Sequence, residues 1–401
     1  WVRASLSPLR ELARRRQETA AIGTPTLVPP RDVFRLRSRP EVMFQPDSPA
    51  AGTNPAAAAF FHLLLPAAGA ADTEPRTDDA GAASLDGLEL VIERRAGDGD
   101  ELVRRLELPE IDAEATQAAL LRVDWDLRSE RTPKIALLRP PAENPELPLE
   151  GERTLSDGGR FARLVPPGRY EIVLRRAATT RDRNASGNGD EGVVLARHAF
   201  EVLQDPAAAF SPEDLAAQQE LLDRIEEAIV GAARLIEASE RLRQQLDEHR
   251  RWLSTAAPSS PSTGAGAAAP DDSDLAAELE EADSALAAIE DELFDLRLTP
   301  ASQDTLRWQR RLYAQLVYLA RRVDQSDHRP TAAQEEVWLQ LQSQLAEVQH
   351  RYHEWAEGAL PALRKRIADA VRSGRLLDAA LEAESPEASQ EARAEPEERD
   401  R

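Results

Sequence analysis

The sequence predicts an α+β protein of several domains, in which an immunoglobulin- or fibronectin-III-like β-sandwich is followed by an antiparallel, coiled-coil-like four-helix bundle. Two patterns predict this fold class. Residues 46–204 hold short apolar runs divided by Gly- and Pro-rich turns, and residues 205–380 hold apolar positions spaced three and four residues apart. With 401 residues, of which 41% are hydrophobic, the chain is long enough for two or three domains.

Composition marks three segments outside these two domains. Residues 1–45 are basic and rich in proline, which favours an irregular connector without long helices. Residues 254–272 consist largely of Pro, Ser, Gly, Ala and Asp and predict a flexible linker inside the helical domain. Residues 381–401 are dominated by Glu and predict a disordered acidic tail.

About seven strands are expected in the first domain, at a spacing typical of a β-sandwich. They are residues 58–65, 88–94, 102–108, 120–127, 161–165, 170–175 and 193–203. Trp125 lies in the fourth run, on the face that alternation also gives to Val123 and Leu127. We therefore interpret Trp125 as an anchor of the core.

Ser211 and Pro212 predict the start of the first helix, as an N-cap residue followed by proline at the first helical position. It should run to about Leu253. Its apolar stripe is formed by Ile225, Ile229, Ala232, Ile236, Ser239, Leu246 and Leu253. The second helix has an a/d pattern formed by Leu275, Leu279, Ala282, Leu286, Ile289, Leu293 and Leu296.

Two further helices are expected. The third should cover residues 306–323, and Arg329-Pro330 followed by Thr331 and Gln334 forms a break and a capping box before the fourth. The fourth helix carries Trp338, Leu341, Leu345, Val348, Tyr352, Trp355 and Ala359, and Pro361 should kink or end it. Short turns join the second, third and fourth helices, so they should be antiparallel neighbours.

Charge and cysteine content exclude several classes of function. The net charge of −22 argues against nucleic acid as a partner, because phosphate binding needs a basic surface. The chain has no cysteine, which excludes disulfides, zinc–thiolate sites and thiol nucleophiles. The most apolar run, residues 56–71, is interrupted by His62 and Pro66 and is shorter than the roughly 20 residues of a span, so we expect a buried strand.

The charge is distributed unevenly along the chain. A basic cluster near the start can indicate nucleic acid or anionic lipid, but here we expect it to solvate a connector or to dock on a neighbouring acidic domain. The cluster consists of Arg10, Arg14, Arg15, Arg16, Arg31, Arg35, Arg37 and Arg39.

No catalytic, cofactor-binding or metal-binding residue is predicted, and no cofactor is expected. His350 and His353 could face one metal from the fourth helix, but Glu354 does not complete His-Glu-x-x-His, and solvated side chains are preferred.

Groups of acidic residues also have simpler interpretations than a site. Asp98, Asp100 and Glu101, like residues 188–191, fit a turn better than a calcium loop. Acids such as Glu278, Glu280 and Glu281 are interpreted as a solvated helix face rather than as a glycosidase pair. The heptad patterns could serve a partner helix or a homodimer, but four in one chain are more simply satisfied within it.

Several segments, in order, resemble one family. Residues 1–10 are similar to the end of a last propeller blade, residues 32–37 to the crossover after it, and residues 52–63 to a first sandwich strand. Residues 123–128 and 166–170 are similar to later strand motifs, and Asp205-Pro206 leads into the helices. Together they resemble the C-terminal region of bacterial BNR/Asp-box repeat proteins, which are sialidase-like or sortilin-like propellers often labelled glycosyl hydrolases.

The resemblance implies that a propeller precedes this region and that any chemistry lies there. The Asp-box pattern Ser-x-Asp-x-Gly-x-x-Trp is absent from the sequence, and no sialidase residue maps onto it. We therefore expect a non-catalytic accessory region that packs on its own propeller and binds protein, and whose longer protein is secreted, periplasmic or at the cell surface. The alternatives are the non-catalytic end of a sialidase-like glycoside hydrolase, and an assembly protein that self-associates through its helices.

Overall fold

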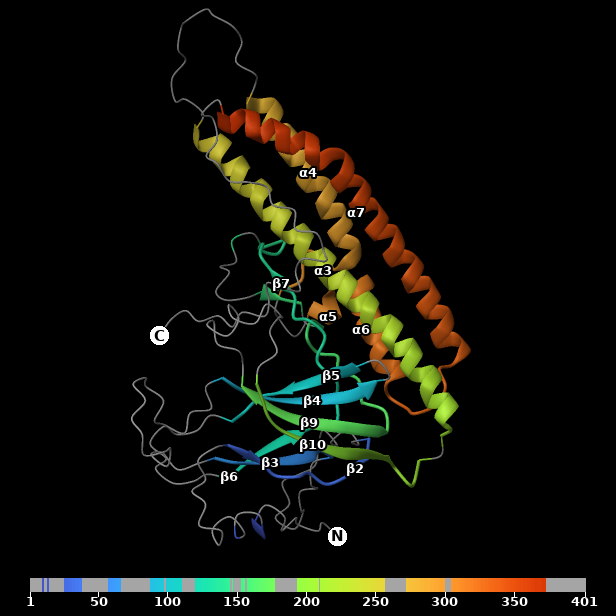
Figure 1. Cartoon of the computed structure of the whole chain (residues 1–401). Helices are drawn as coiled ribbons and strands as arrows, with labels where there is room; N and C mark the ends of the chain where they lie inside the picture. The colour runs from blue at the N-terminus through green and yellow to red at the C-terminus, as the bar shows by residue number, and fades with distance from the viewer. Residues whose placement is uncertain are drawn as a thin grey trace, which may run out of the picture. The chain divides into compact units, whose positions relative to one another are not determined.

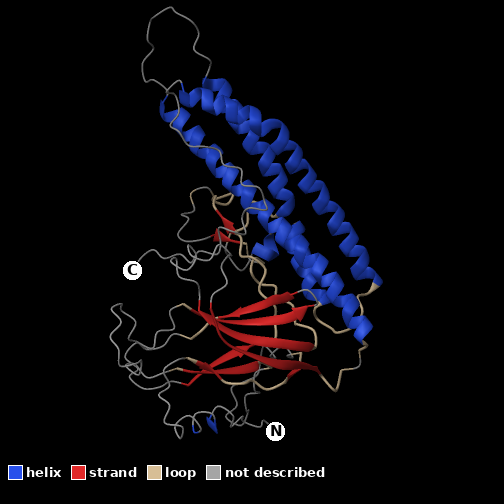
Figure 2. Ribbon diagram, in the orientation of Figure 1, coloured by secondary structure: helices blue, strands red, loops and turns tan. Residues whose placement is uncertain are grey.

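The chain forms two compact units that interleave in sequence (Figures 1 and 2). The sheet unit consists of Trp1–Glu130 and Ala162–Ala209, and the helical unit of Arg131–Phe161 and Phe210–Arg401. This computed structural model describes residues 9–10, 13, 25–37, 57–65, 87–96, 99–109, 120–144, 146, 153–155, 157–176, 193–208, 210–256, 272–299 and 304–372. The expected blade strand at residues 1–6, residues 257–271 of the linker and the tail at 381–401 lie outside these ranges.

The sheet unit holds a five-stranded sheet in the order β2-β10-β9-β4-β5 and a three-stranded sheet in the order β1-β3-β6. Strand β2 runs parallel to β10, and the other described pairs are antiparallel. The strands are β1 (Thr26–Leu27), β2 (Val33–Arg35), β3 (Ala59–Leu64), β4 (Leu88–Ala96), β5 (Gly99–Leu106), β6 (Leu120–Trp125), β9 (Gly168–Arg176) and β10 (Val193–Gln204). Six of the seven predicted strands are thus confirmed, whereas residues 161–165 form only a single bridge at Leu164.

Alternating apolar residues from both sheets share one core, and its centre is aromatic. The ring of Phe61 on β3 lies 5.4 Å from that of Phe200 on β10, and the ring of Trp125 on β6 lies 5.9 Å from that of Tyr170 on β9. Trp125 is 1% exposed, as expected for a core anchor.

The Pro-Pro-Gly turn before β9 is closed by the tyrosine that follows it. The Tyr170 hydroxyl donates a 2.6 Å hydrogen bond to the Pro166 carbonyl, and Gly168 supplies a φ of 150° that other residues rarely adopt. Burial raises the pKa of the Tyr170 hydroxyl to about 12. The arrangement is of the kind called a tyrosine corner in β-sheet proteins.

The Trp-Asp-Leu-Arg motif at the end of β6 folds into a tight turn. Trp125 Nε1 donates to the Arg128 carbonyl at 2.8 Å, while Leu127 adopts a φ of 59°. A left-handed leucine costs roughly 1–2 kcal/mol, which its complete burial offsets.

The helical unit is built from long helices and one short hairpin. Its elements are β7 (Ala136–Leu137), β8 (Arg153–Thr154), α3 (Pro212–Ala256), α4 (Asp272–Leu293), α5 (Asp304–Arg307), α6 (Leu312–Val323) and α7 (Ala332–Arg372). Figure 1 shows α4 running alongside the C-terminal parts of α3 and α7, while α6 lies by their N-terminal parts. The predicted apolar row of α4 and most of that of α7 lie in the core of this unit, together with the buried residues of α3, whereas Ala359 of the predicted α7 row is exposed.

The predicted helix starts are confirmed at atomic detail. Asp214 N donates to Ser211 Oγ at 3.1 Å, which satisfies one free amide of the first turn of α3. At α7, Thr331 N donates to Gln334 Oε1 at 2.9 Å and Gln334 N to Thr331 Oγ1 at 3.3 Å, the two halves of a capping box.

One helix prediction is wrong. Residues 306–323 do not form one helix, because the chain turns extended at Arg311, whose ψ is −178°, and separates α5 from α6. Of the two outcomes expected at Pro361, an end of the helix does not occur, because α7 continues to Arg372 and buries Leu363 and Ile367 beyond the proline. The missing Pro361 N–H frees the carbonyl of Glu357, which lies on an exposed stretch where water can bind it.

The predicted fold class, a β-sandwich followed by an antiparallel four-helix bundle, is also wrong. Residues 33–35, which the resemblance implies are part of a crossover, pair parallel with β10 and make the larger sheet mixed. The helices do not follow as a separate block, because residues 131–161, between β6 and β9, belong to the helical unit. Ile135 and Leu137 are buried in the helical core, and alternation alone cannot tell which surface such a short run covers.

We predict that Tyr170→Phe lowers the free energy of unfolding of the sheet unit by about 1 kcal/mol, since it removes one buried hydrogen bond and keeps the ring. Chemical unfolding followed by tryptophan fluorescence would measure the loss. Tyr318→Phe, at a half-exposed ring in the helical unit, is the control and should change stability by less than about 0.5 kcal/mol. If Tyr170→Phe has the same free energy of unfolding as the unsubstituted chain, the hydrogen bond from Tyr170 to Pro166 does not stabilise the fold.

Candidate functional site: a charge network and a groove in the helical unit

Helix α4 is acidic along its whole length, with nine Asp or Glu residues and no Lys or Arg. Six of these acids form ion pairs with arginines from other elements of the helical unit. The pairs are Glu278–Arg366, Glu280–Arg250, Asp283–Arg243, Asp283–Arg139, Glu290–Arg243, Asp291–Arg311 and Glu292–Arg351. Arginines of α3, of α7, of the segment after β7 and of the turn before α6 therefore all meet on this one helix.

The heptad positions of α4 explain which acid meets which neighbour. In the frame of its apolar row, Asp283 and Glu290 take e positions directly after Ala282 and Ile289, and both pair with α3. Glu278 and Glu292 take g positions directly before Leu279 and Leu293, and both pair with α7. The two flanks of one apolar row thus select two different partner helices.

Arg243 lies at the centre of the buried part of this network. Its Nε is 2.7 Å from Asp283 Oδ1, and its Nη1 donates to Glu290 Oε2. The Arg243 side chain is 9% exposed and that of Glu290 is 0% exposed. Burial disfavours both ionised groups, but the pairing outweighs it for Arg243 and raises the pKa of its guanidinium.

The same network fastens the segment after β7 onto the helices. Glu240 on α3 accepts the backbone N–H groups of Leu138 and Arg139 at 2.8 and 3.1 Å. The Arg139 guanidinium then reaches Asp283 at 2.7 Å and Asp247 at 3.1 Å. Charge-assisted contacts of this kind give direction as well as energy, so the segment is held in one orientation on α3 and α4.

Glu290 is the carboxyl that the network satisfies least. Burial is the largest cause that raises its pKa, to about 7, and the nearby charge of Glu240 adds to it, while Arg243 opposes the shift. Glu290 Oε1 and Ser239 Oγ have no conventional hydrogen-bond partner among the described residues, although the Ser239 hydroxyl is close enough to lower this pKa slightly. The phenol of Tyr352 faces Glu290 from α7.

The sequence itself carries a signal for this cluster. In the predicted stripe of α3, Ser239 is followed by Leu246, which skips the position where the row would place Arg243. A charged residue in a regular apolar row marks a position that sets helix register or partner. The arginine at that position is the centre of the network.

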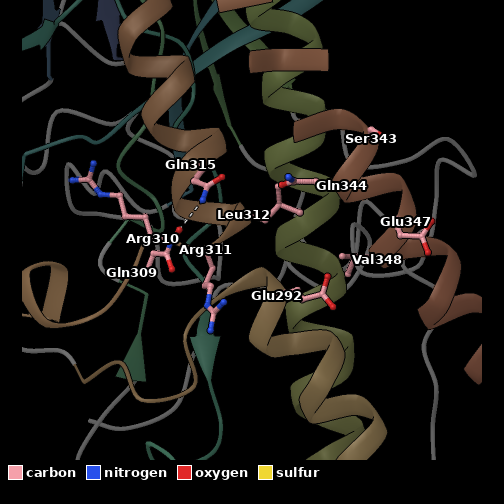
Figure 3. A pocket seen from close by; sticks show the side chains of 10 residues that line it. All are labelled: Glu292, Gln309, Arg310, Arg311, Leu312, Gln315, Ser343, Gln344, Glu347 and Val348. Atoms are coloured by element: carbon pink, nitrogen blue, oxygen red, sulfur yellow. Dashed lines mark hydrogen bonds between the residues drawn. The ribbon is translucent and has the colours of Figure 1, made fainter. Parts of the chain in front are cut away.

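A groove opens beside the network, where the turn before α6 meets α4 and α7 (Figure 3). Its volume is about 430 Å³, and it is lined by Glu292, Gln309, Arg310, Arg311, Leu312, Gln315, Ser343, Gln344, Glu347 and Val348. Gln315 Nε2 donates to the Arg310 carbonyl at 2.7 Å, which fixes one wall. Three glutamines and one serine line the groove beside four charged residues, and their amide and hydroxyl groups can form hydrogen bonds to a polypeptide backbone.

A small cavity of about 30 Å³ lies on the other side of the same turn, between Leu155, Phe294 and Trp308. Tyr313 lines it and is 1% exposed, and burial raises the pKa of its hydroxyl. That hydroxyl has no hydrogen-bond partner among the described residues. The space is enough for one or two waters, and a water there would satisfy it.

The histidines considered for a metal do not converge. His350 Nε2 lies 3.4 Å from Glu354 Oε1 one turn on, and the ring of His353 packs on that of Tyr352. Both histidines are exposed on α7. Across the part of the chain that the structure describes, no group of three or more His, Cys, Asp or Glu side chains is placed to hold a metal ion.

The acidic residues considered for other sites are engaged in ion pairs. Asp100 lies 2.7 Å from Arg197, which also binds Glu171 and Glu93, while Asp98 and residues 188–191 lie outside the described residues. Glu280 and Glu281 are exposed, as expected for a solvated helix face, although Glu280 pairs with Arg250, whereas Glu278 is only partly exposed and pairs with Arg366.

Two expectations about the start of the chain can be compared with the fold. Arg35 does not solvate a connector, because it is 1% exposed on β2 and its Nε donates to the Val165 carbonyl at 2.6 Å. The apolar run around Phe61 forms strand β3, as expected.

None of the described helices has the length and apolar character that crossing a membrane requires.

Comparison with protein-family models, with curated proteins and with solved structures finds no match to this chain. The resemblance to BNR/Asp-box proteins therefore stays a hypothesis that rests on the motifs quoted above.

We predict that Arg243→Met lowers the free energy of unfolding of the helical unit by about 3–5 kcal/mol, because it leaves the carboxylates of Asp283 and Glu290 buried without their main partner. Urea unfolding followed by far-ultraviolet circular dichroism would measure the change. Arg321→Met, the same substitution at an exposed position of α6, is the control. A loss below about 1 kcal/mol would show that Arg243 does not hold the helices together.

We predict that Glu290→Gln flattens the pH dependence of stability between pH 4.5 and about 7. The folded chain holds a proton on Glu290 that the unfolded chain releases at its ordinary pKa of 4.5, so the stabilisation from this group is complete below 4.5 and lost as pH rises through about 7. Unfolding free energies at a series of pH values would test this. Glu281→Gln, at an exposed acid of the same helix, should leave the slope unchanged, and an unchanged slope in Glu290→Gln would contradict the assignment.

Proposed function

We propose that this chain is a non-catalytic accessory and interaction region of a longer BNR/Asp-box propeller protein. In this proposal the sheet unit packs on the propeller and the helical unit binds protein. The observation that carries it is the ion-pair network of α4, in which buried acids pair with arginines, together with the groove beside it, whose lining includes three glutamine side chains.

The network supports an interaction role because it fixes geometry. Ion pairs at the flanks of a heptad row set which helices pair and in which register, at little gain in stability. A groove whose walls come from α4, α6 and α7 keeps its shape only if these helices keep their register. Fixed walls reduce the entropy lost on binding, which favours recognition of a polypeptide.

Two motifs of the sheet unit support the link to propeller proteins. Residues 123–128 and 166–170, on which the resemblance partly rests, form two turns closed by their own side chains, Trp125 and Tyr170. A secreted, periplasmic or cell-surface location is part of the same proposal, since the resemblance implies it.

The link to a propeller is tested by the reading frame upstream of Trp1. We expect it to encode several copies of Ser-x-Asp-x-Gly-x-x-Trp. An arginine cluster among them would make the longer protein a sialidase-like hydrolase, whereas the repeats alone would make it a binding propeller. If the frame encodes no such repeat, the proposal is wrong.

The non-catalytic and monomeric character of this region can be measured directly. We expect the 401-residue chain to release no sugar from sialosides or other glycosides above background, and to elute as a monomer in light scattering, because the apolar rows of α4 and α7 are already buried. Hydrolysis that a point substitution within the chain abolishes would contradict the first expectation. A stable dimer broken by charge substitutions on α7 would favour the self-assembly alternative.

A further inference from the structure

One segment of this acidic chain is basic. Between Asp304 and Asp324 the sequence carries five arginines and no acid, whereas the whole chain has a net charge of −22. The arginines are Arg307, Arg310, Arg311, Arg321 and Arg322. Arg311 is used inside the fold, where it pairs with Asp291 at 2.9 Å, but the other four are exposed.

Three residues of this segment form a stack on the surface of α6. The guanidinium carbons of Arg310 and Arg322 lie 5.0 and 4.9 Å from the centroid of the Tyr318 ring. Arg322 also donates to the Tyr318 hydroxyl and, at 3.0 Å, to Gln325 Oε1, both of which are neutral. Within the described residues, no carboxylate pairs with Arg310, Arg321 or Arg322.

The positive potentials of these arginines reinforce one another. Arg310 and Arg322 flank the same ring, so they lie within about one Debye length of each other, roughly 8–10 Å. Arg321 follows Tyr318 by three residues and shares its side of the helix. We call the surface formed by Arg310, Tyr318, Arg321 and Arg322 the α6 surface. An anion that bridges its guanidinium groups would relieve their repulsion.

The start of α6 adds to the same potential. Its N-cap residue, Arg311, makes no side-chain capping bond, and its first turn holds no acid. Free backbone N–H groups and the helix dipole both favour negative charge there. The groove begins at this point, and Figure 3 shows the Arg310 side chain directed away from its acidic lining residues, Glu292 and Glu347.

We propose that the α6 surface binds an acidic segment of a partner protein, with carboxylates on Arg310 and Arg322 and the peptide backbone along Gln309 and Gln315 at the near wall of the groove. Arginine binds carboxylate through two parallel hydrogen bonds, and Tyr318 holds both guanidinium planes ready for them. The inference rests on the proposed function in that it assigns the kind of partner that the helical unit binds.

A polypeptide fits this surface better than a nucleic acid or a membrane. The basic patch is short, and the groove beside it also holds the carboxylates of Glu292 and Glu347. A phosphate backbone or a lipid surface would extend beyond it onto negative charge. A short run of carboxylates ends within the patch, and the amides beside it complement a peptide backbone and not a row of phosphates.

The test uses the 401-residue chain and a fluorescent synthetic peptide of alternating Glu and Ala, followed by anisotropy. We expect saturable binding that weakens as salt is added, and no binding of the same peptide with Gln in place of Glu. Arg310→Gln with Arg322→Gln should weaken binding about tenfold or more, since each lost charged contact is worth on the order of a factor of ten. Arg364→Gln with Lys365→Gln removes the same charge from exposed positions of α7 and should change affinity less than about twofold.

Three outcomes would overturn the inference: no binding of the Glu peptide, equal losses in the two double variants, or tighter binding of polyuridylate or of phosphatidylserine vesicles through Arg310 and Arg322. Circular dichroism of each variant confirms that it is folded. The result is independent of the upstream sequence. If the Glu peptide does not bind but Asp-boxes are encoded upstream, only the acidic partner is ruled out. If the Glu peptide binds but no Asp-box is encoded upstream, only the link to a propeller is ruled out.

Discussion

The helical unit depends on the acidity of α4. Nine like charges on one helix repel one another, and the free energy of an isolated α4 would be unfavourable for that reason. Its arginine partners lie on α3, on α7, after β7 and before α6. The helix is therefore stable only when these elements are in place, and each of them is positioned by the acid that it meets. Folding of this unit should be cooperative, because the acids of α4 have all their arginine partners only in the complete structure.

The buried part of this network favours specificity over stability. An arginine and two carboxylates inside an apolar core lose hydration, and their mutual attraction about balances that cost. What the arrangement gives is a single register, because Arg243 pairs with both Asp283 and Glu290, which lie one heptad apart on α4, and sliding α3 by one heptad would separate Arg243 from one of them. Arg139 and Glu240 extend the same logic to a segment far away in sequence, so residues 131–161 are located by charge as much as by the burial of Ile135 and Leu137.

Local chemistry was sufficient to predict most elements but not their partners. Ser211, Thr331 and the apolar rows define the starts and buried faces of α3, α4 and α7, and alternation finds β4, β9 and β10, because these signals act within one element. The placement of Ile135 and Leu137 depends on which surface lies opposite them, which the local sequence does not show. The break before α6 coincides with an ion pair between Arg311 and Asp291, a contact that the local sequence does not show either. Arg243 is an intermediate case. Its place in an apolar row is visible in the sequence, whereas its partners on α4 are not.

The arginines of the helical unit divide into two sets with different uses. Those that meet α4 pair with its acids, and the buried one, Arg243, contacts two of them at once. Arg310, Arg321 and Arg322 meet no carboxylate among the described residues and stack on or flank an exposed tyrosine, so the fold gains little from their charge. In a chain with a net charge of −22, a basic surface that the fold does not require remains available to an acidic ligand, and it lies beside an open groove. Binding therefore accounts for these charges better than stability does.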